Sequence, residues 1–204
     1  MRALFVSYTT SMGANQNAVQ ASSARLDERY GVCREPSEIR PWEEGVKPRS
    51  LVMLTKEVGT SLRTYRDLAQ GELFWNMSQC STFIWAMDEL GQVFLAFEEV
   101  IPDGDIDIDG LKEGHPRRRG FPAHPAQEKK LGHPTLLGGG QARVAGELLL
   151  DVAEEKLHWF VNCASGRYCR LMPPTHDQCR AIHELFMECI DDGVRFDNPL
   201  STDQ

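Results

Sequence analysis

Apolar, β-rich runs occur in two closely spaced pairs along this chain. In the first pair, residues 83–87 and 93–97 flank a short acidic turn that contains Gly91. In the second pair, residues 142–150 and 157–161 are separated by residues 151–156, four of which are charged. Two β-forming runs joined by a short polar turn are typical of a hairpin. The chain is therefore expected to contain two antiparallel hairpins.

Residues 175–190 carry the clearest helix pattern. Thr175 is a candidate N-cap, Gln178 stands three positions later, as in a capping box, and Gly193 follows the pattern. The apolar residues recur at spacings of three and four and form one stripe, made of Cys179, Ile182, Phe186 and Cys189, with Leu185 and Ile190 beside it. This periodicity predicts an amphipathic helix that packs on the sheet.

The first 80 residues give weaker signals. Residues 15–30 favour a peripheral helix ended by Gly31, three prolines between positions 36 and 48 indicate a connector, and residues 51–70 form a mixed segment. We expect an α+β fold: an antiparallel β meander of two hairpins over residues 81–204, a C-terminal amphipathic helix packed on it, and a helical or irregular layer over residues 1–80. Together they are expected to form one compact domain.

Charge and hydropathy exclude several classes of protein. The 204 residues include 22 Lys and Arg against 30 Asp and Glu, a formal net charge of −8. This excess of acid argues against a nucleic-acid partner, which needs a basic face. No apolar run approaches the roughly 18 residues of a membrane span. Because the first apolar stretch turns polar at Ser7, the sequence predicts a cytoplasmic protein, or one exported without a cleavable signal peptide.

Six cysteines are spread through the chain, and none forms a Cys-x-x-Cys motif. Their density is far below that of a scaffold stabilised by disulfides. Buried, reduced thiols that act as small apolar residues are the favoured interpretation. Disulfides, or a metal-binding or catalytic role, are the alternatives.

Asp105, Asp107 and Asp109, followed by Gly110, match the first half of an EF-hand calcium loop. Three carboxylates at alternating positions suit a hard cation such as calcium. The twelfth position of such a loop, however, is Pro116 instead of a bidentate glutamate. The segment is therefore either a calcium site or a solvated acidic loop.

Residues 101–140 form a long polar excursion that ends in three consecutive glycines, 138–140. Stretches of this length without regular structure inside a compact domain are usually functional or disordered. Glycines allow the backbone to approach a ligand closely, and His133 and Thr135 stand just before them. Gly146, inside a predicted strand, also indicates a close backbone approach.

The Ser-Gly-Arg-Tyr sequence at residues 165–168 forms a polar turn after the second hairpin. We expect this turn and the glycine loop to line one cleft. In that cleft the predicted ligand-binding residues are Thr135, Gly138, Gly139, Ser165, Gly166 and Arg167, and the predicted catalytic residues are His133, Tyr168 and Glu147. Alternatively, His133, Thr135 and Ser165 only hydrogen-bond the loop backbone, while Tyr168 fills the core.

The order of these motifs resembles a C-terminal module of the plant IQ-motif calmodulin-binding proteins and of related uncharacterised bacterial and fungal proteins. The matching residues lie between about 83 and 194 and are His133, Thr135, Leu137, Gly138, Gly139, Ala145, Gly146, Ser165, Gly166, Tyr168, Gly193 and Val194. Where that family has a histidine before the tyrosine, this chain has Arg167, and it has no IQ motif. The resemblance implies a shared fold and site, but neither calmodulin binding nor a particular reaction.

Three functions fit these patterns. The first is a module of the bacterial effector or toxin-associated type that binds a small molecule or a protein, because no nucleophile elbow or metal-ligand set stands out. The second is a transferase or hydrolase that uses NAD, because His133, Tyr168 and a later glutamate, Glu188 or Glu147, resemble in order the His-Tyr-Glu set of ADP-ribosyltransferases. The third, an acidic immunity or inhibitor protein, rests on the net charge alone. The sequence leaves the cofactor open: NAD and calcium are the two candidates, and neither is established by these patterns.

Overall fold

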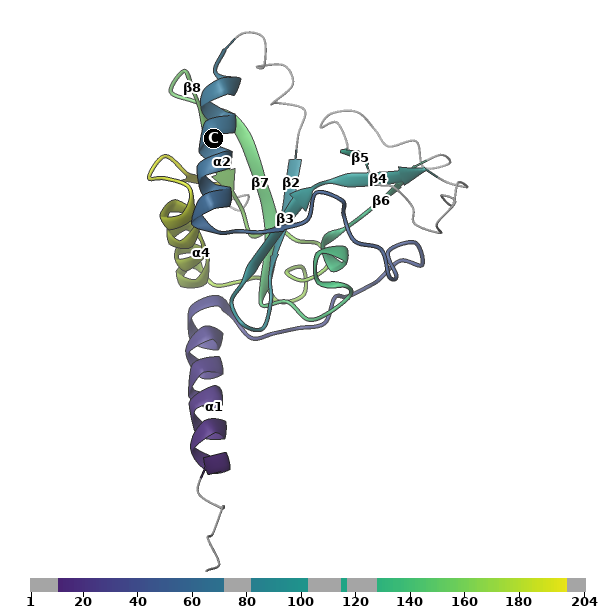
Figure 1. Cartoon of the computed structure of the whole chain (residues 1–204), viewed down its shortest axis with the longest axis vertical. Helices are drawn as coiled ribbons and strands as arrows, with labels where there is room; N and C mark the ends of the chain where they lie inside the picture. The colour runs from purple at the N-terminus through teal and green to yellow at the C-terminus, as the bar shows by residue number, and fades with distance from the viewer. Residues whose placement is uncertain (1–10, 72–81, 103–114, 117–127, 198–204) are drawn as a thin grey trace, which may run out of the picture.

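The computed structural model describes residues 11–71, 82–102, 115–116 and 128–197. It confirms the α+β class predicted from the sequence. A six-stranded sheet in the order β1-β3-β2-β7-β8-β9 forms the centre, and α2 and α4 lie beside each other against its β8 end (Figure 1). Neighbouring strands are antiparallel except β8 and β9, which are parallel.

Both expected hairpins are present in this sheet. Its strands are β1 (Val52–Met53), β2 (Thr82–Met87), β3 (Val93–Phe97), β7 (Val144–Ala153), β8 (Lys156–Val161) and β9 (Arg195–Phe196). The turn between β7 and β8 is tighter than the sequence predicts, because only Glu154 and Glu155 connect the strands, with φ of 52° and 64°. Two successive residues with positive φ match the right-handed twist of the strands they join.

Two of the helices, α1 and α4, match the helices predicted over residues 15–30 and 175–190, whereas the sequence patterns predict no helix for α2 or η1. They are α1 (Ser11–Tyr30), α2 (Lys56–Ala69), the 3₁₀ helix η1 (His133–Leu137) and α4 (His176–Cys189). At the start of α4, the Thr175 hydroxyl accepts from the Gln178 N–H at 3.3 Å, and the Gln178 side chain accepts from the Thr175 N–H at 2.9 Å. The predicted capping box is thus confirmed. Helix α1 projects from the rest of the molecule (Figure 1) and ends before Gly31, whose φ is 94°.

The part of the chain that connects the two hairpins in sequence forms a second, three-stranded sheet. Its strands are β4 (Glu99–Pro102), β5 (His115–Pro116) and β6 (Glu128–Lys130), in the order β5-β4-β6. Residues 101–140 therefore contain regular structure that the sequence patterns do not reveal, because strands of two to four residues show no periodicity. Asp105, Asp107 and Asp109 of the predicted calcium loop lie outside the described residues.

Residues 52–69, within the predicted N-terminal layer, contribute directly to the sheet and its helical cover. Strand β1 pairs with β3, with Val52 opposite Leu95. Helix α2 packs on β8 and crosses α4 at Gly59, where an added Cβ would lie 1.8 Å from the carbonyl oxygen of Cys189. Only a residue without a side chain allows this close crossing of the two helices.

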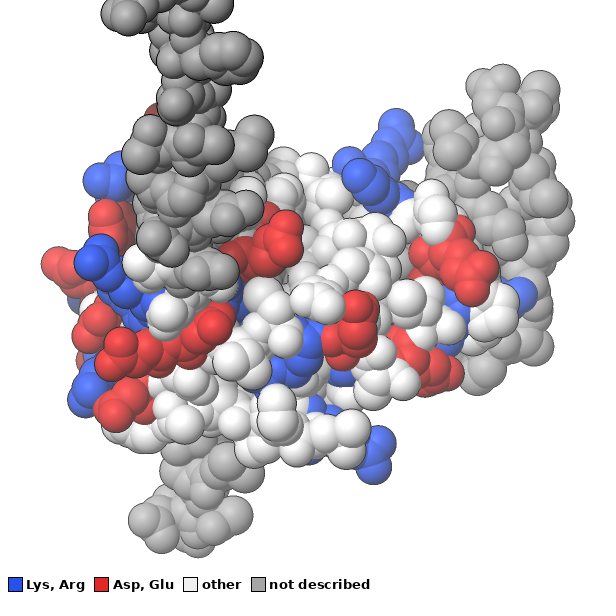
Figure 2. All heavy atoms as spheres, turned by 90° about the horizontal axis from the view of Figure 1, so that it is seen from below, with Lys and Arg blue, Asp and Glu red and all other residues white. Residues whose placement is uncertain are grey.

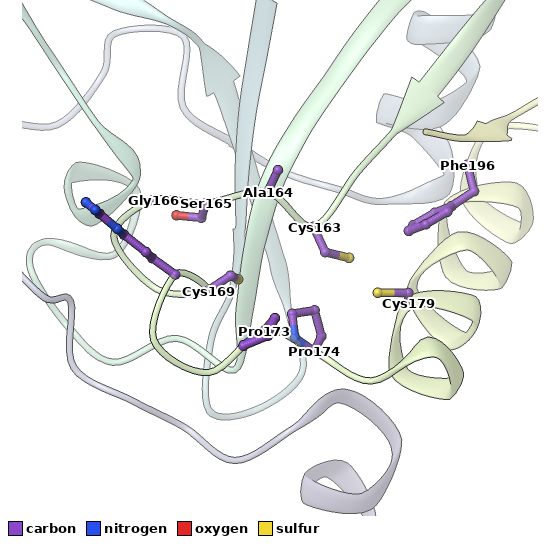
Figure 3. A pocket seen from close by; sticks show the side chains of 10 residues that line it. Cys163, Ala164, Ser165, Gly166, Cys169, Pro173, Pro174, Cys179 and Phe196 are labelled. Carbon is purple, nitrogen blue, oxygen red and sulfur yellow. The ribbon is translucent and has the colours of Figure 1, made fainter. Parts of the chain in front are cut away.

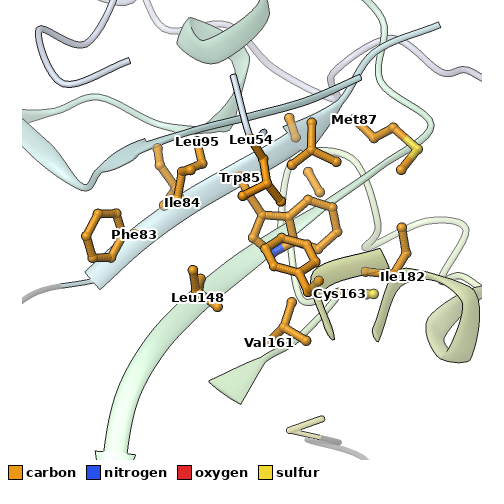
Figure 4. Close-up of a cluster of buried hydrophobic side chains, with 14 of the residues drawn as sticks. Leu54, Phe83, Ile84, Trp85, Met87, Leu95, Leu148, Val161, Cys163 and Ile182 are labelled. Atoms are coloured by element: carbon orange, nitrogen blue, oxygen red, sulfur yellow. The ribbon is translucent and has the colours of Figure 1, made fainter. Parts of the chain in front are cut away.

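The core lies between the sheet and the two helices (Figure 4). Trp85 of β2 and Phe186 of α4 are fully buried, and their rings make an edge contact with centroids 5.3 Å apart. Trp159 of β8 is also buried, and its indole N–H donates to the Leu62 carbonyl of α2 at 3.2 Å. One tryptophan therefore fixes each helix to the sheet. None of the helices in the described part of the chain is long and apolar enough to cross a membrane.

Candidate functional site

A polar pocket of about 200 Å³ lies where three loops meet. The loops are the connector before β1, the start of η1, and the turn after β8. The pocket is lined by Arg40, Glu43, Lys130, Gly132, His133, Glu147, Ala164, Gly166 and Arg167. The structure thus brings four of the predicted site residues, His133, Glu147, Gly166 and Arg167, to one pocket.

Glu43 joins the loops around this pocket. Its side chain is completely buried. One carboxylate oxygen accepts the Arg40 N–H at 2.7 Å, and the other accepts the Gly132 N–H at 2.9 Å. The Arg167 guanidinium lies 3.6 Å from the carboxylate. A buried carboxylate is tolerated only when it is paired and hydrogen-bonded, and Glu43 meets both conditions.

Arg167 presents a guanidinium beside this carboxylate. Its Nη1 donates to the Glu38 carbonyl at 2.6 Å and lies 3.4 Å from the Glu38 carboxylate. These contacts and the approach to Glu43 all involve Nη1. A guanidinium carries donors on two further nitrogens, in a planar arrangement that matches carboxylate and phosphate groups.

Two further cations, Arg40 and Lys130, line the pocket. The Arg40 guanidinium lies over the Trp42 ring, 5.4 Å from its centroid. The Trp42 indole N–H donates to the Lys130 carbonyl at 3.0 Å. The Lys130 ammonium pairs with Glu98, whose side chain is buried. Both cationic side chains are more than one third exposed, so they reach solvent as well as the pocket.

His133 is a neutral group in this pocket. Its ring is buried, and Nε2 lies 2.9 Å from the Gly146 carbonyl oxygen, so this nitrogen carries the proton. Burial is the main cause that lowers the pKa of His133 from 6.5 to about 4, and the charges of Lys130 and Arg167 act in the same direction. At neutral pH the ring therefore adds no charge to the pocket, and its Nε2–H is already used.

The neighbouring strand shows why glycine occurs at position 146. A Cβ added there would lie 1.9 Å from the carbonyl oxygen of Asn162. The close backbone approach expected at Gly146 is therefore present, and it occurs between β7 and the end of β8. The Asn162 side-chain oxygen also accepts the Glu147 N–H at 3.0 Å, which fixes Glu147 at the pocket wall.

Three predicted site residues, Thr135, Ser165 and Tyr168, hydrogen-bond the loop backbone and do not line the polar pocket. The Tyr168 hydroxyl is buried and donates to the Gly140 carbonyl at 2.7 Å. Burial, together with Glu35 and Glu43, raises the pKa of Tyr168 above its ordinary value. The Ser165 hydroxyl accepts the Arg167 and Tyr168 N–H groups, and the Thr135 hydroxyl donates to the Gly132 carbonyl at 2.7 Å. These contacts match the structural alternative stated for the three residues.

Gly138 and Gly139 end the 3₁₀ helix η1 and do not line the polar pocket. Their φ values of 61° and 84° are accessible mainly to glycine. Within the described ranges, no group of three or more His, Cys, Asp or Glu is arranged to hold a metal ion.

The sequence did not reveal Arg40, Glu43 or Lys130 as site residues. Arg40 and Glu43 lie in a proline-rich stretch that has the composition of a connector, and nothing local links Glu43 to Gly132, 89 residues later. Lys130 stands three positions before His133. This proximity to a predicted site residue is the one sequence signal that links Lys130 to the site.

A larger pocket of about 470 Å³ is lined by Leu136 and Leu137 at the end of η1 and by Gly140, among other residues. It contains the acidic residues Asp88 and Glu89, but Asp88 already accepts backbone N–H groups of the β2–β3 turn. The smaller pocket is the better candidate site because its charged side chains come from four separate segments, the connector before β1, β6, β7 and the turn after β8, and line one pocket.

Comparison with known proteins adds no family to this description. The chain matches no protein-family model, and no curated protein or solved structure is significantly similar to it. The likeness to the plant IQ-motif module therefore remains a prediction from the sequence motifs.

Proposed function

We propose that this protein is a binding module that takes up a small anionic ligand in the polar pocket. The observation that carries this proposal is the convergence of three cations, Arg40, Lys130 and Arg167, on one pocket. The lining acids are Glu43, which is occupied by backbone N–H groups, and Glu147. A carboxylate or phosphate group is the ligand chemistry that arginine recognises through paired donors.

The size of the pocket limits the ligand. Sites for drug-sized ligands and cofactors usually measure about 300–1,000 Å³, whereas this pocket has about 200 Å³. It suits a molecule with the bulk of an amino acid or a small organic acid. NAD is too large to be enclosed there, and the Tyr168 hydroxyl and His133 Nε2 are already hydrogen-bonded. These observations favour the binding module over the NAD-using transferase.

Acidic and basic side chains are interspersed over the face of the molecule seen in Figure 2. A long-range field of one sign needs like charges gathered together. The preference for an anion is therefore assigned to the pocket and not to the surface as a whole. The effector-type role and the resemblance to the IQ-motif module remain parts of this proposal. Both hypotheses include a site formed by the η1 segment and the 165–168 turn.

Thermal unfolding with phosphate, acetate, glutamate and citrate tests the proposal. A ligand at 100 times its Kd stabilises by about 2.7 kcal/mol, which raises the Tm of a chain of this size by roughly 5–10 °C. We expect at least one probe to give a saturable rise in the wild-type protein. The rise should disappear in Arg167→Gln and persist in Arg180→Gln, because Arg180 is exposed on α4 and bonded to Asp177. An equal rise in both variants would contradict the proposal.

A further inference from the structure

Cysteines gather at a second, apolar pocket of about 270 Å³ behind the turn that follows β8 (Figure 3). Cys163, Cys169 and Cys179 line it together with Pro173, Pro174 and Phe196. All three thiols are free. The polar-pocket function described above does not use any of them.

Two of these cysteines face each other. Cys163 comes two residues after the end of β8, and Cys179 lies in the first turns of α4. Figure 3 shows their sulfur atoms pointing toward one another, and a hydrogen bond joins the two side chains. The two thiols are therefore in contact, although they come from separate elements.

The two thiols are chemically unequal. The hydrogen bond with Cys163 lowers the pKa of Cys179, while the same bond and burial raise the pKa of Cys163. Cys179 is half-buried, whereas Cys163 is buried. The N-terminal turns of a helix also favour a thiolate. Cys179 is thus the nucleophilic member of the pair, and Cys163 is the thiol that donates to it.

Cys169 differs from this pair although it lines the same pocket. Its thiol donates to the Ala145 carbonyl at 3.3 Å, and burial raises its pKa. Cys169 therefore provides an internal control for the reactivity of the pocket.

We propose that Cys163 and Cys179 form a modification site at which a hydroperoxide produces a reversible disulfide. The Cys179 thiolate attacks one peroxide oxygen, the O–O bond breaks, and the leaving oxygen takes up a proton as water or an alcohol. Cys163 then attacks the sulfenic acid at Cys179: the S–S bond forms, the S–O bond breaks, and the hydroxyl leaves as water with the Cys163 proton. The two sulfurs lose two electrons in total, and the peroxide gains them.

The surrounding chain allows the thiols to close to the S–S distance of about 2.05 Å. Between β8 and α4 the chain contains turns but no helix or strand. A Cβ added at Gly166 in this segment would have no other atom within 4 Å. Ala164 and Gly166 line both the apolar and the polar pocket, so closure moves a segment shared by the two. Oxidation itself does not depend on the ligand proposed above.

Peptide mapping of the full chain tests this site. The reduced protein is freed of reductant, treated with hydrogen peroxide, alkylated and digested. We expect a Cys163–Cys179 linked peptide pair in wild type, a decrease of about 2 Da in intact mass before alkylation, and recovery of both thiols with dithiothreitol. The Cys169→Ser protein should form the same bond. Cys163→Ser should instead accumulate oxidised forms of Cys179.

Two results would overturn the proposal. One is recovery of Cys163 and Cys179 as alkylated thiols at peroxide concentrations that oxidise other cysteines of the chain. The other is stable sulfinic acid at Cys179 in wild type without the linked peptide. Both results are read from wild-type protein, so the test does not depend on whether a variant folds.

Discussion

The carboxylate of Glu43 accepts a hydrogen bond at 2.9 Å from the backbone N–H of Gly132, 89 residues later in the chain. A Cβ at position 132 would lie 2.7 Å from the same oxygen, so any larger residue there would force the Glu43 carboxylate to shift. The other oxygen of Glu43 binds the Arg40 N–H and lies near Arg167. The shape of the polar pocket therefore depends on one buried carboxylate.

Replacing this carboxylate tests its role. In Glu43→Gln, the amide retains one acceptor oxygen but turns an NH₂ group toward a backbone donor. We expect a loss of about 2 kcal/mol in the free energy of unfolding, because one of the two buried backbone N–H groups loses its hydrogen bond to the charged carboxylate. Urea denaturation measures it. Glu44→Gln is the control, because Glu44 is the exposed neighbour; equal stability of the two variants would contradict the assigned role.

The close approach at Gly146 gives a second prediction. Because a Cβ would meet the Asn162 carbonyl oxygen at 1.9 Å, Gly146→Ala must push β7 and the end of β8 apart. We expect a destabilisation of at least about 2 kcal/mol, measured by denaturant unfolding. Gly166→Ala serves as the matched control, because nothing lies within 4 Å of a Cβ there. Similar midpoints for the two variants would show that the strands separate more easily than the structure indicates.

His133 predicts a pH dependence of stability. Its pKa falls from 6.5 to about 4 on folding, so the unfolded chain binds the proton more tightly. Stability is therefore complete above about pH 6.5 and decreases as the pH falls toward 4, by about 3 kcal/mol in total. Unfolding free energies measured between pH 7 and 4 check this. The decrease should be smaller by about 3 kcal/mol in His133→Gln. His176→Gln, at an exposed position, is the control and should behave like the wild type. Equal pH profiles for the wild type and both variants would refute this role of His133.

The capping box of α4 gives a smaller effect. Thr175→Ala removes the acceptor for the Gln178 N–H, so we expect a loss of about 1 kcal/mol in unfolding free energy, whereas Thr175→Ser should retain most of it. Thermal or urea unfolding distinguishes them. If alanine and serine behave alike, the hydroxyl does not stabilise the helix.

The elements that could be predicted from the sequence are those with local signals. The β2–β3 and β7–β8 hairpins have long apolar runs around turn residues, and α4 has a capping box followed by an apolar stripe. Strands β4, β5 and β6 have only two to four residues each and are formed by pairing with one another, which no local pattern records.

The candidate site was only partly accessible from sequence for the same reason. His133, Glu147, Gly166 and Arg167 lie in or near glycine-containing motifs, and they do line the polar pocket. Tyr168 and Ser165 share a motif with Arg167, yet the fold directs their hydroxyl groups to loop backbone. Glu43 becomes recognisable only when tertiary structure places it against Gly132.

The most direct measurement is an NMR titration of ¹⁵N-labelled protein with phosphate and, separately, with glutamate. We predict that at least one of these anions shifts the backbone amide signals of Gly132, Gly166 and Arg167 in a saturable way, because these residues line the polar pocket. The Arg180 amide on the exposed side of α4 should not move. If neither anion shifts the pocket signals, or if the saturable shifts occur instead at Gln141 in the larger pocket, the polar pocket is not an anion-binding site.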